Sequence, residues 1–172
     1  MRAIAHPFFE TLYIDPETGL YWEEVKNWGK GNSCLFSLLI EDPAKVTPEA
    51  VEFAVSALAD VAALNTLARK ALQNNRTHQP HGPVATFCEQ CVAPVSGSLL
   101  SQSIQEDAAQ TLTEDNFLQL LRLPLVAVYP EQEEAPLMLE YALPLGFESQ
   151  KTLQVLFSRL GDPLDVVFNN GL

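Results

Sequence analysis

The sequence predicts an α+β domain built on a mainly antiparallel sheet of about six to seven strands, with a long helix packed on one face. Three observations support this fold class: strand-like segments fill the first forty residues, helical periodicity dominates the middle of the chain, and strand-like segments return after residue 124. Strands grouped at both ends, with helices between them, are typical of α+β domains. The length of 172 residues predicts a single domain over 1–172.

The first forty residues are expected to form three strands joined by short turns. The segment FFETLYID ends at Asp15 and is followed by DPETG, in which Pro16 and Gly19 favour a tight turn. LYWEEVKNW is the second expected strand, and the glycine-rich residues 29–32 form the next turn. SCLFSLLIE is almost continuously apolar, which predicts the buried strand of the three.

A long helix is expected after these strands. Thr47 is a suitable N-cap and Pro48 suits the first helical position. The helix should continue to about Gln73 and end at Asn74–Asn75. Its apolar stripe follows spacings of three and four and comprises Val51, Val55, Leu58, Val61, Ala62, Ala68 and Leu72.

The second half of the chain is expected to add a short helix and four strands. Residues 96–113 indicate a surface connection, and Thr113 then caps the helix TEDNFLQLLR, which Pro124 stops. The strands are LVAVY, PLMLEYAL, TLQVLFSRL and PLDVVFNN. The last two are separated by the tight turn LGDP, so we expect them to pair antiparallel, with Phe168 buried.

The composition narrows the class of function. A net charge of −12 disfavours nucleic acid and anionic membranes as partners, because the phosphate groups would be repelled. It favours rapid encounter with a basic protein, although many acidic proteins carry such charge for solubility alone. Three cysteines form no even-numbered disulfide framework. With no apolar run of signal-peptide length near the N-terminus, we expect a cytoplasmic protein.

The segment HQPHGPVATFCEQC, residues 78–91, is the one candidate for a metal or redox site. His78, His81, Cys88 and Cys91 are the ligand types that zinc prefers, and C-x2-C is also the spacing of thiol oxidoreductases. A zinc-binding or metal-dependent protein centred on these four residues is therefore the alternative function.

The periodicity of the same segment favours ordinary core packing. Val84, Phe87, Cys88, Cys91 and Val95 follow the spacing of one helical face. Cysteine is often buried as a small hydrophobe, so both cysteines are expected to point inward. We accordingly expect no metal and no cofactor.

The sequence offers little for an enzyme. Only three histidines are available as bases and no G-x-S-x-G motif is found, so we expect a non-enzymatic protein. Trp22 and Trp28, near Tyr21, are candidates for contacting a partner, because aromatic residues dominate interface hot spots. Glu131, Glu133 and Glu134 are acidic candidates. Half-buried sheet aromatics and solvated loop charge are the alternatives.

Several stretches together resemble a known family. HPFFETLYIDPETGLYWEEV, the helix end ALNTLARKAL, LVAVYP, LEYAL and LQVLFSRLGDPLDVVFNN look like a family of small acidic bacterial α+β domains of uncharacterised function. The chain departs from that family over residues 78–112 and at Asn169–Asn170. Similar domains occur beside polymorphic toxin systems as immunity proteins. The resemblance therefore implies a protein that binds and neutralises a toxin, and it supplies no catalytic residues.

Overall fold

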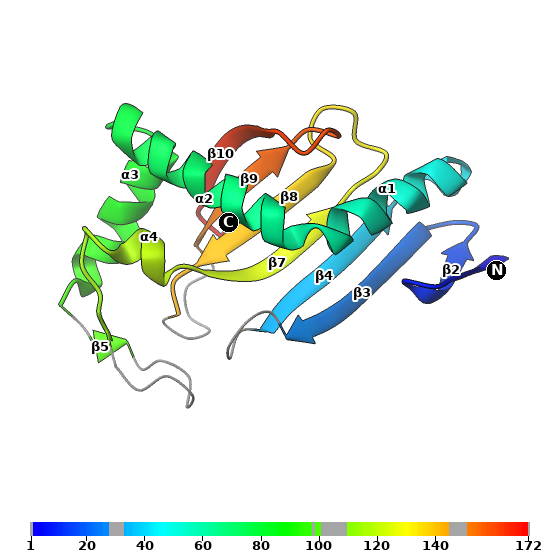
Figure 1. Cartoon of the computed structure of the whole chain (residues 1–172), viewed down its shortest axis with the longest axis horizontal. Helices are drawn as coiled ribbons and strands as arrows, with labels where there is room; N and C mark the ends of the chain where they lie inside the picture. The colour runs from blue at the N-terminus through cyan, green and yellow to red at the C-terminus, as the bar shows by residue number, and fades with distance from the viewer. Residues whose placement is uncertain (1, 28–32, 98, 101–109, 145–150, 172) are drawn as a thin grey trace.

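The computed structural model describes residues 2–27, 33–97, 99–100, 110–144 and 151–171. Its centre is an eight-stranded mixed sheet in the order β1-β2-β3-β4-β7-β8-β9-β10 (Figure 1). All neighbouring strands pair antiparallel except β4 and β7, which are parallel. The strands are β1 (Arg2–His6), β2 (Glu10–Asp15), β3 (Gly19–Asn27), β4 (Ser33–Ile40), β7 (Arg122–Val128), β8 (Leu137–Ala142), β9 (Thr152–Phe157) and β10 (Pro163–Asn169). The α+β class is confirmed.

The sheet has one strand more than the six to seven expected, because β1 precedes the segment in which the first strand was placed. β1 pairs with β2 through a hairpin that ends at Glu10, a non-glycine residue with φ of 61°. β1 is mostly exposed, so its sequence carries little apolar alternation. Besides this pairing, the Nε2 atom of His6 lies 3.3 Å from the Glu52 carboxylate on the first helix.

β3 and β4 form the expected hairpin, although its turn, 29–32, lies outside the described residues. β4 is not buried on both faces: Cys34, Phe36, Leu38 and Ile40 are buried, whereas the residues between them are half-buried. One face of β4 therefore belongs to the core and the other does not.

The long helix is broken into two. Thr47 caps α1 (Pro48–Ala59) as expected, since its Oγ1 accepts a hydrogen bond from the Ala50 amide. At Asp60 the chain bends by 71° into α2 (Val61–His78). The bend lets α1 pack on β7 while α2 packs on β9 and β10, which a straight helix could not do over a twisted sheet. It also leaves Ala62 exposed, contrary to the expected stripe.

α2 extends past Asn74–Asn75 because Asn75 is part of the core. Its Oδ1 accepts a hydrogen bond from the Val84 amide and its Nδ2 donates to Gln79. The chain then continues through α3 (Pro83–Phe87), the π-helical turn η2 (Cys88–Val92) and the 3₁₀ turn η3 (Ala93–Val95). The expected helix over this segment is confirmed.

The connection 96–113 is described only in part. It includes the two-stranded sheet of β5 (Leu99–Leu100) and β6 (Gln110–Thr111), while 101–109 lie outside the described residues. Thr113 and Asn116 exchange hydrogen bonds ahead of the one-turn helix α4 (Phe117–Leu120). A 3₁₀ turn, η1 (Pro43–Lys45), links β4 to the α1 cap.

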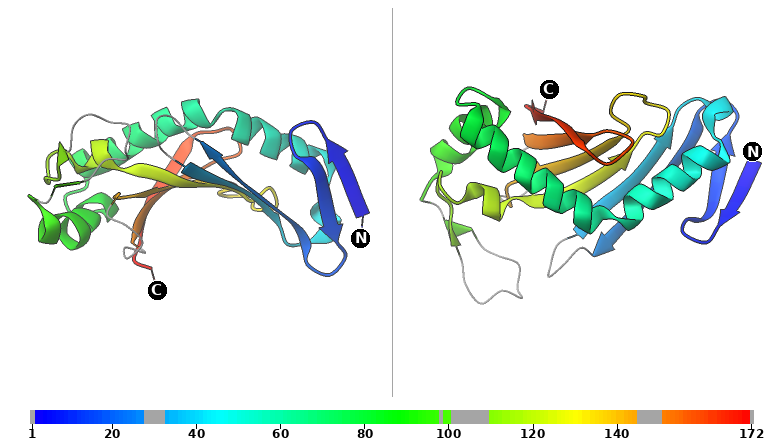
Figure 2. Two further views of the ribbon diagram at one scale, coloured as in Figure 1. Left: turned by 90° about the horizontal axis from the view of Figure 1, so that it is seen from below. Right: turned by 45° about the horizontal axis from the view of Figure 1, so that its top comes forward.

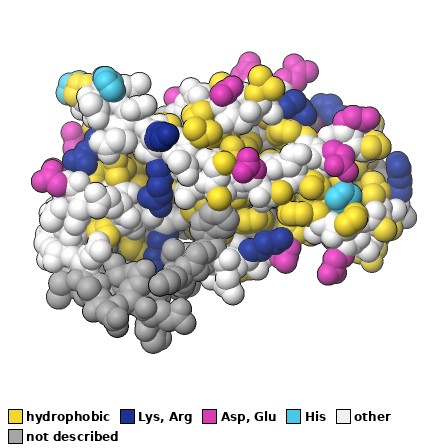
Figure 3. All heavy atoms as spheres, in the orientation of Figure 1, with side chains coloured by type: hydrophobic (Ala, Val, Ile, Leu, Met, Phe, Trp, Pro, Cys, Tyr) yellow, Lys and Arg dark blue, Asp and Glu magenta, His cyan; other side chains and the backbone are white. Residues whose placement is uncertain are grey.

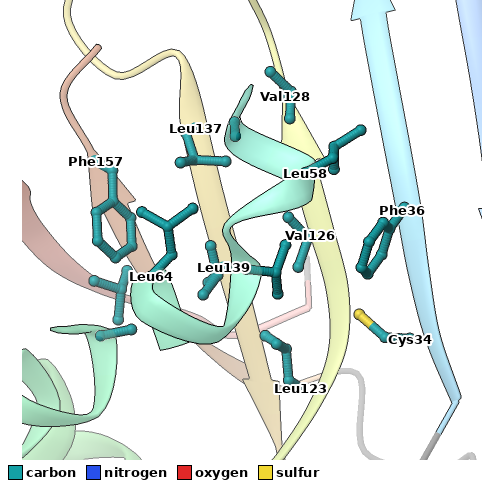
Figure 4. Close-up of a cluster of buried hydrophobic side chains, with 14 of the residues drawn as sticks. Cys34, Phe36, Leu58, Leu64, Leu123, Val126, Val128, Leu137, Leu139 and Phe157 are labelled. Carbon is teal, nitrogen blue, oxygen red and sulfur yellow. The ribbon is translucent and has the colours of Figure 1, made fainter. Parts of the chain in front are cut away.

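The core lies between the sheet and the helices. Figure 4 shows Leu58 of α1 and Leu64 of α2 packed over Val126, Leu139 and other strand residues. Figure 2 shows that the helices lie on one side of an arched sheet, and its other side carries none of the described helices. The fold thus has two layers, with a helix-bearing face and an open face.

β10 closes one end of the sheet and pairs antiparallel with β9, as expected. A register irregularity between Pro163 and Asp165 leaves Leu164 exposed. Val166 is buried, whereas Phe168 is only half-buried against the Phe87 ring, 5.9 Å away between centroids. The expected full burial of Phe168 is therefore wrong, because an edge strand has a neighbour on one side only.

Candidate binding surface

The open face of the sheet is built from every second residue of its strands. Two rows of side chains cross it, because paired residues on neighbouring strands point the same way. The first row is Val25, Leu35, Leu125, Glu140, Gln154 and Val167, and the second is Glu23, Ser37, Ala127, Met138, Leu156 and Asp165. Tyr21 lies opposite Leu39 in a third, shorter row.

This face is unusually apolar for a surface that none of the described helices covers. An antiparallel sheet with one face in water usually alternates apolar and polar residues. Here Leu35, Leu125, Met138 and Leu156 occupy the outward positions of four central strands and are half-buried. Towards β2 and β3, Tyr13, Tyr21 and Val25 are 59%, 60% and 65% exposed. Exposed apolar patches of this kind mark interaction sites on proteins.

Acidic groups are set among these apolar side chains. The Tyr21 hydroxyl donates a hydrogen bond to the Glu23 carboxylate, and this bond raises the pKa of Tyr21. Glu140 accepts a hydrogen bond from Gln154 Nε2 at 2.8 Å. Burial and then the charge of Glu140 raise the pKa of the half-buried Tyr129. Asp165 ends the second row, so carboxylates occur at both ends and in the centre of the surface.

The opposite face differs in charge. Lysine and arginine side chains are spread over the helix-bearing face among carboxylates and apolar groups (Figure 3). In the two rows of the open face every ionisable side chain is a carboxylate, and Arg122, paired with Ala142 beyond Glu140, adds a cation next to them. Carboxylates and apolar side chains thus lie side by side on the face that the described helices leave uncovered.

The aromatic residues singled out from the sequence do not meet on one surface. Trp22 points to the helix-bearing face, where its ring packs edge-on against Phe9 with centroids 4.7 Å apart. Trp28 lies outside the described residues. Tyr21, next to Trp22 in the chain, points to the open face. The alternation of LYWEEV already separates these two rings, so it was the usable signal for Tyr21 and Val25.

The acidic candidates lie in the loop between β7 and β8. Glu131 is held by the fold itself, since its carboxylate accepts hydrogen bonds from the amides of Glu41 and Asp42 at 3.0 and 3.2 Å. It fastens this loop to the end of β4. Glu133 and Glu134 are exposed and remain candidates for contact with a partner.

The four candidate metal ligands lie in two different environments, the histidines in solvent and the cysteines against the core. His78 and His81 are exposed near the end of α2, and the ring nitrogen Nδ1 of His78 lies 3.0 Å from the Asn74 carbonyl. Cys88 and Cys91 are half-buried against the core, and burial raises the pKa of both thiols, which favours the protonated form over the thiolate that binds zinc. Within the described ranges, no three His, Cys, Asp or Glu side chains are grouped closely enough to hold a metal ion.

The π-helical turn changes the face that the sequence periodicity predicted. The Ala93 amide bonds to the Cys88 carbonyl, five residues back, which widens the helix locally. Val92 thereby becomes fully buried, and Cys91 moves to the margin of the core. The wider turn was not visible in the spacing of apolar residues.

Comparison of the chain with protein-family models, with curated proteins and with solved structures finds no match. The resemblance to small acidic bacterial domains therefore rests on the sequence pattern alone. In the part of the chain that the structure describes, no single helix is long and apolar enough to cross a membrane; α1 and α2 combine sufficient length and hydropathy only together, across their bend.

Proposed function

We propose that this chain is a non-enzymatic acidic binding protein whose open sheet face covers a basic surface of a protein partner. The observation that carries the proposal is the combination of apolar rows with carboxylates on a face that none of the described helices covers. A partner docked there supplies a third layer to a two-layer fold and removes exposed apolar surface from water.

The most concrete form of the proposal is an immunity protein that neutralises a toxin in the cytoplasm. The net charge of −12 supports it, because toxins that act on nucleic acids present basic clefts and opposite charges accelerate association. Tyr21 and Val25 are the expected anchors, since both are exposed at one end of the surface and bury apolar area on contact. Glu23, Glu140 and Asp165 are the expected charge partners.

Co-expression with the product of the neighbouring gene tests the toxin form of the proposal. If that product is toxic, the chain should restore growth and form a complex with it. Tyr21→Ser combined with Val25→Ser should weaken the complex by about 10- to 100-fold. Leu160→Ser is the matched control, because Leu160 is 89% exposed and lies away from the open face.

The on-rate provides a second measurement. It should fall as salt concentration rises, and Glu23→Gln should lower it further with little change in the off-rate. An on-rate independent of salt would remove the electrostatic part of the proposal. Equal losses in the open-face variant and the Leu160→Ser control would contradict the choice of surface.

A further inference from the structure

The outer edge of β10 lies beside a groove on the helix-bearing side. The groove has a volume of about 540 Å³ and runs between α2 and β10. Its lining includes Leu67, Lys70 and Ala71 of α2 and Leu164, Asp165 and Val166 of β10. β10 is last in the strand order, so among the described strands only β9 pairs with its main chain. An edge of this kind offers hydrogen-bonding groups to another strand.

Exposed apolar side chains mark this edge as a surface separate from the open face. Among the described residues, six large hydrophobic side chains are exposed, and Tyr13, Tyr21 and Val25 belong to the open face. The other three surround the β9–β10 hairpin: Leu67 at 38%, Leu164 at 54% and Leu160 at 89%. Two of these three line the groove. The patch therefore borders the first part of the β10 edge, Pro163–Val166, next to the stretch Val167–Asn169.

The first part of β10 is less open to pairing than the last part. Pro163 lacks an amide hydrogen, and the Asp165 carboxylate accepts a hydrogen bond from the Val166 amide at 2.8 Å. The stretch available to a new strand is therefore Val167–Asn169, with Leu164 and Val166 as apolar contacts at its side.

A strand added to this edge meets two different environments. Val166 points to the helix-bearing face, as its burial against the core shows, whereas Asp165 ends a row of the open face. Successive side chains of an added strand alternate between these faces. Those on the α2 side meet Leu67 and Ala71, with the cation of Lys70 on the same wall. Those on the other side meet the carboxylate of Asp165.

We propose that β10 binds an extended segment of a protein partner as a ninth strand. The segment carries apolar side chains towards α2 and at least one basic side chain towards Asp165. Lys70 repels a basic side chain from the α2 side. The added strand is therefore expected to place its apolar side chains towards α2 and its basic side chains towards Asp165, and not the reverse. A second copy of the chain is a poorer occupant, because each copy has a net charge of −12. The inference uses neither Tyr21 nor Val25 and shares only Asp165 with the open face, so it does not depend on the proposed function.

Two peptides of about eight residues, both with acetylated N-termini and amidated C-termini, test this proposal on the full chain. One alternates valine and lysine; the other has the same residues as a block of valines followed by a block of lysines. The two have equal charge and composition, so only the alternating peptide matches the two sides of the edge. At physiological ionic strength we expect it to bind at least ~10-fold more tightly and to shift the amide resonances of Val167–Asn169.

Variants and a modified peptide separate strand addition from attraction by charge. Leu67→Ser and Leu164→Ser should each weaken binding, while Leu160→Ser, outside the groove, should not. N-methylation of alternate amides in the peptide should abolish binding, because it removes main-chain donors. Equal affinity for the two peptides, or insensitivity to N-methylation, would overturn the proposal. So would a dimer that forms through this edge and is lost in Leu164→Ser, because a second copy would then be the occupant.

Discussion

Gly19 begins β3 under two independent constraints. Its φ of +84° is unfavourable for any residue with a side chain, and an added Cβ would lie 2.0 Å from the Ile40 carbonyl oxygen. Gly97 has nearly the same φ, +87°, with nothing within 4 Å of an added Cβ. The pair therefore separates the cost of backbone conformation from the cost of steric overlap.

Gly97→Ala should lower the free energy of unfolding by about 1 kcal/mol, the cost of a left-handed conformation. Gly19→Ala should lower it by at least ~3 kcal/mol, because backbone atoms of Glu41 and Ile40 would have to move. Urea denaturation of the two variants measures the difference. Equal losses would mean that the β2–β3 turn relaxes freely.

Cys34 is a fully buried residue of β4, and burial raises the pKa of its thiol to about 11. The thiol ionises at lower pH in the unfolded chain than in the folded one. Its contribution to stability is therefore complete below about pH 9 and is lost as the pH rises towards 11. Denaturation curves measured at several pH values from 7 to about 11 should show a steeper loss of unfolding free energy with pH for the native chain than for Cys34→Ala.

Other groups also make the stability fall at high pH, because burial raises the pKa of Tyr141 and of Cys91. The difference between the native chain and Cys34→Ala isolates the contribution of Cys34. Parallel stability curves for the two proteins would show that its thiol ionises as readily in the folded state as in the unfolded one.

At the scale of elements, caps and local periodicity were readable from the sequence. Thr47 and Pro48 located the start of α1, and the LGDP turn located the β9–β10 hairpin. The break at Asp60 was not readable, because apolar residues continue at helical spacing through Leu58 and Val61. The bend follows from the curvature of the sheet, which one segment alone does not encode. The open face escaped prediction for a related reason: its rows join residues from six strands whose order the sequence does not state.

The link between α2 and α3 depends on one buried side chain. Removing the amide of Asn75 leaves the buried Val84 amide without its partner, so Asn75→Ala should cost about 1–3 kcal/mol of unfolding free energy. Asn74→Ala is the matched control: Asn74 is exposed, and its replacement should change stability by less than ~0.5 kcal/mol. Thermal denaturation of the pair measures this effect. A comparable loss in both variants would contradict a specific role for the buried amide of Asn75, because alanine favours a helix more than asparagine does.

At the scale of the whole molecule, β10 contributes to the core from one side only. Val166 and Phe168 pack on the helix-bearing side, and β9 would become the exposed edge without them. The strand nevertheless helps to hold α2 and α3 in place, because both helices pack against β10 as well as against β9.

Truncation after Gly161 should therefore leave the chain unfolded or aggregated. It removes the buried Val166 and the half-buried Phe168 from the core, together with the pairing to β9. Full burial of one such side chain is worth roughly 1.5–3 kcal/mol, against a typical total stability of about 5–15 kcal/mol. Circular dichroism and size-exclusion chromatography of the truncated chain measure the outcome. A soluble product with an unchanged melting temperature would contradict a structural role for β10.

The parallel pairing of β4 with β7 divides the sheet into two halves that can fold before they join. β1 to β4 and β7 to β10 each join neighbours along the chain, so both halves of the sheet can form through local hairpins. Among the described strands the two halves join at β4 and β7, which pair from Leu35 with Leu125 to Leu38 with Val128. Closing so long a loop carries a large entropic cost before any contact compensates for it. We expect this junction to form late and to limit the rate of folding. Until it forms, two unjoined sheet edges are exposed to other chains at the centre of the fold.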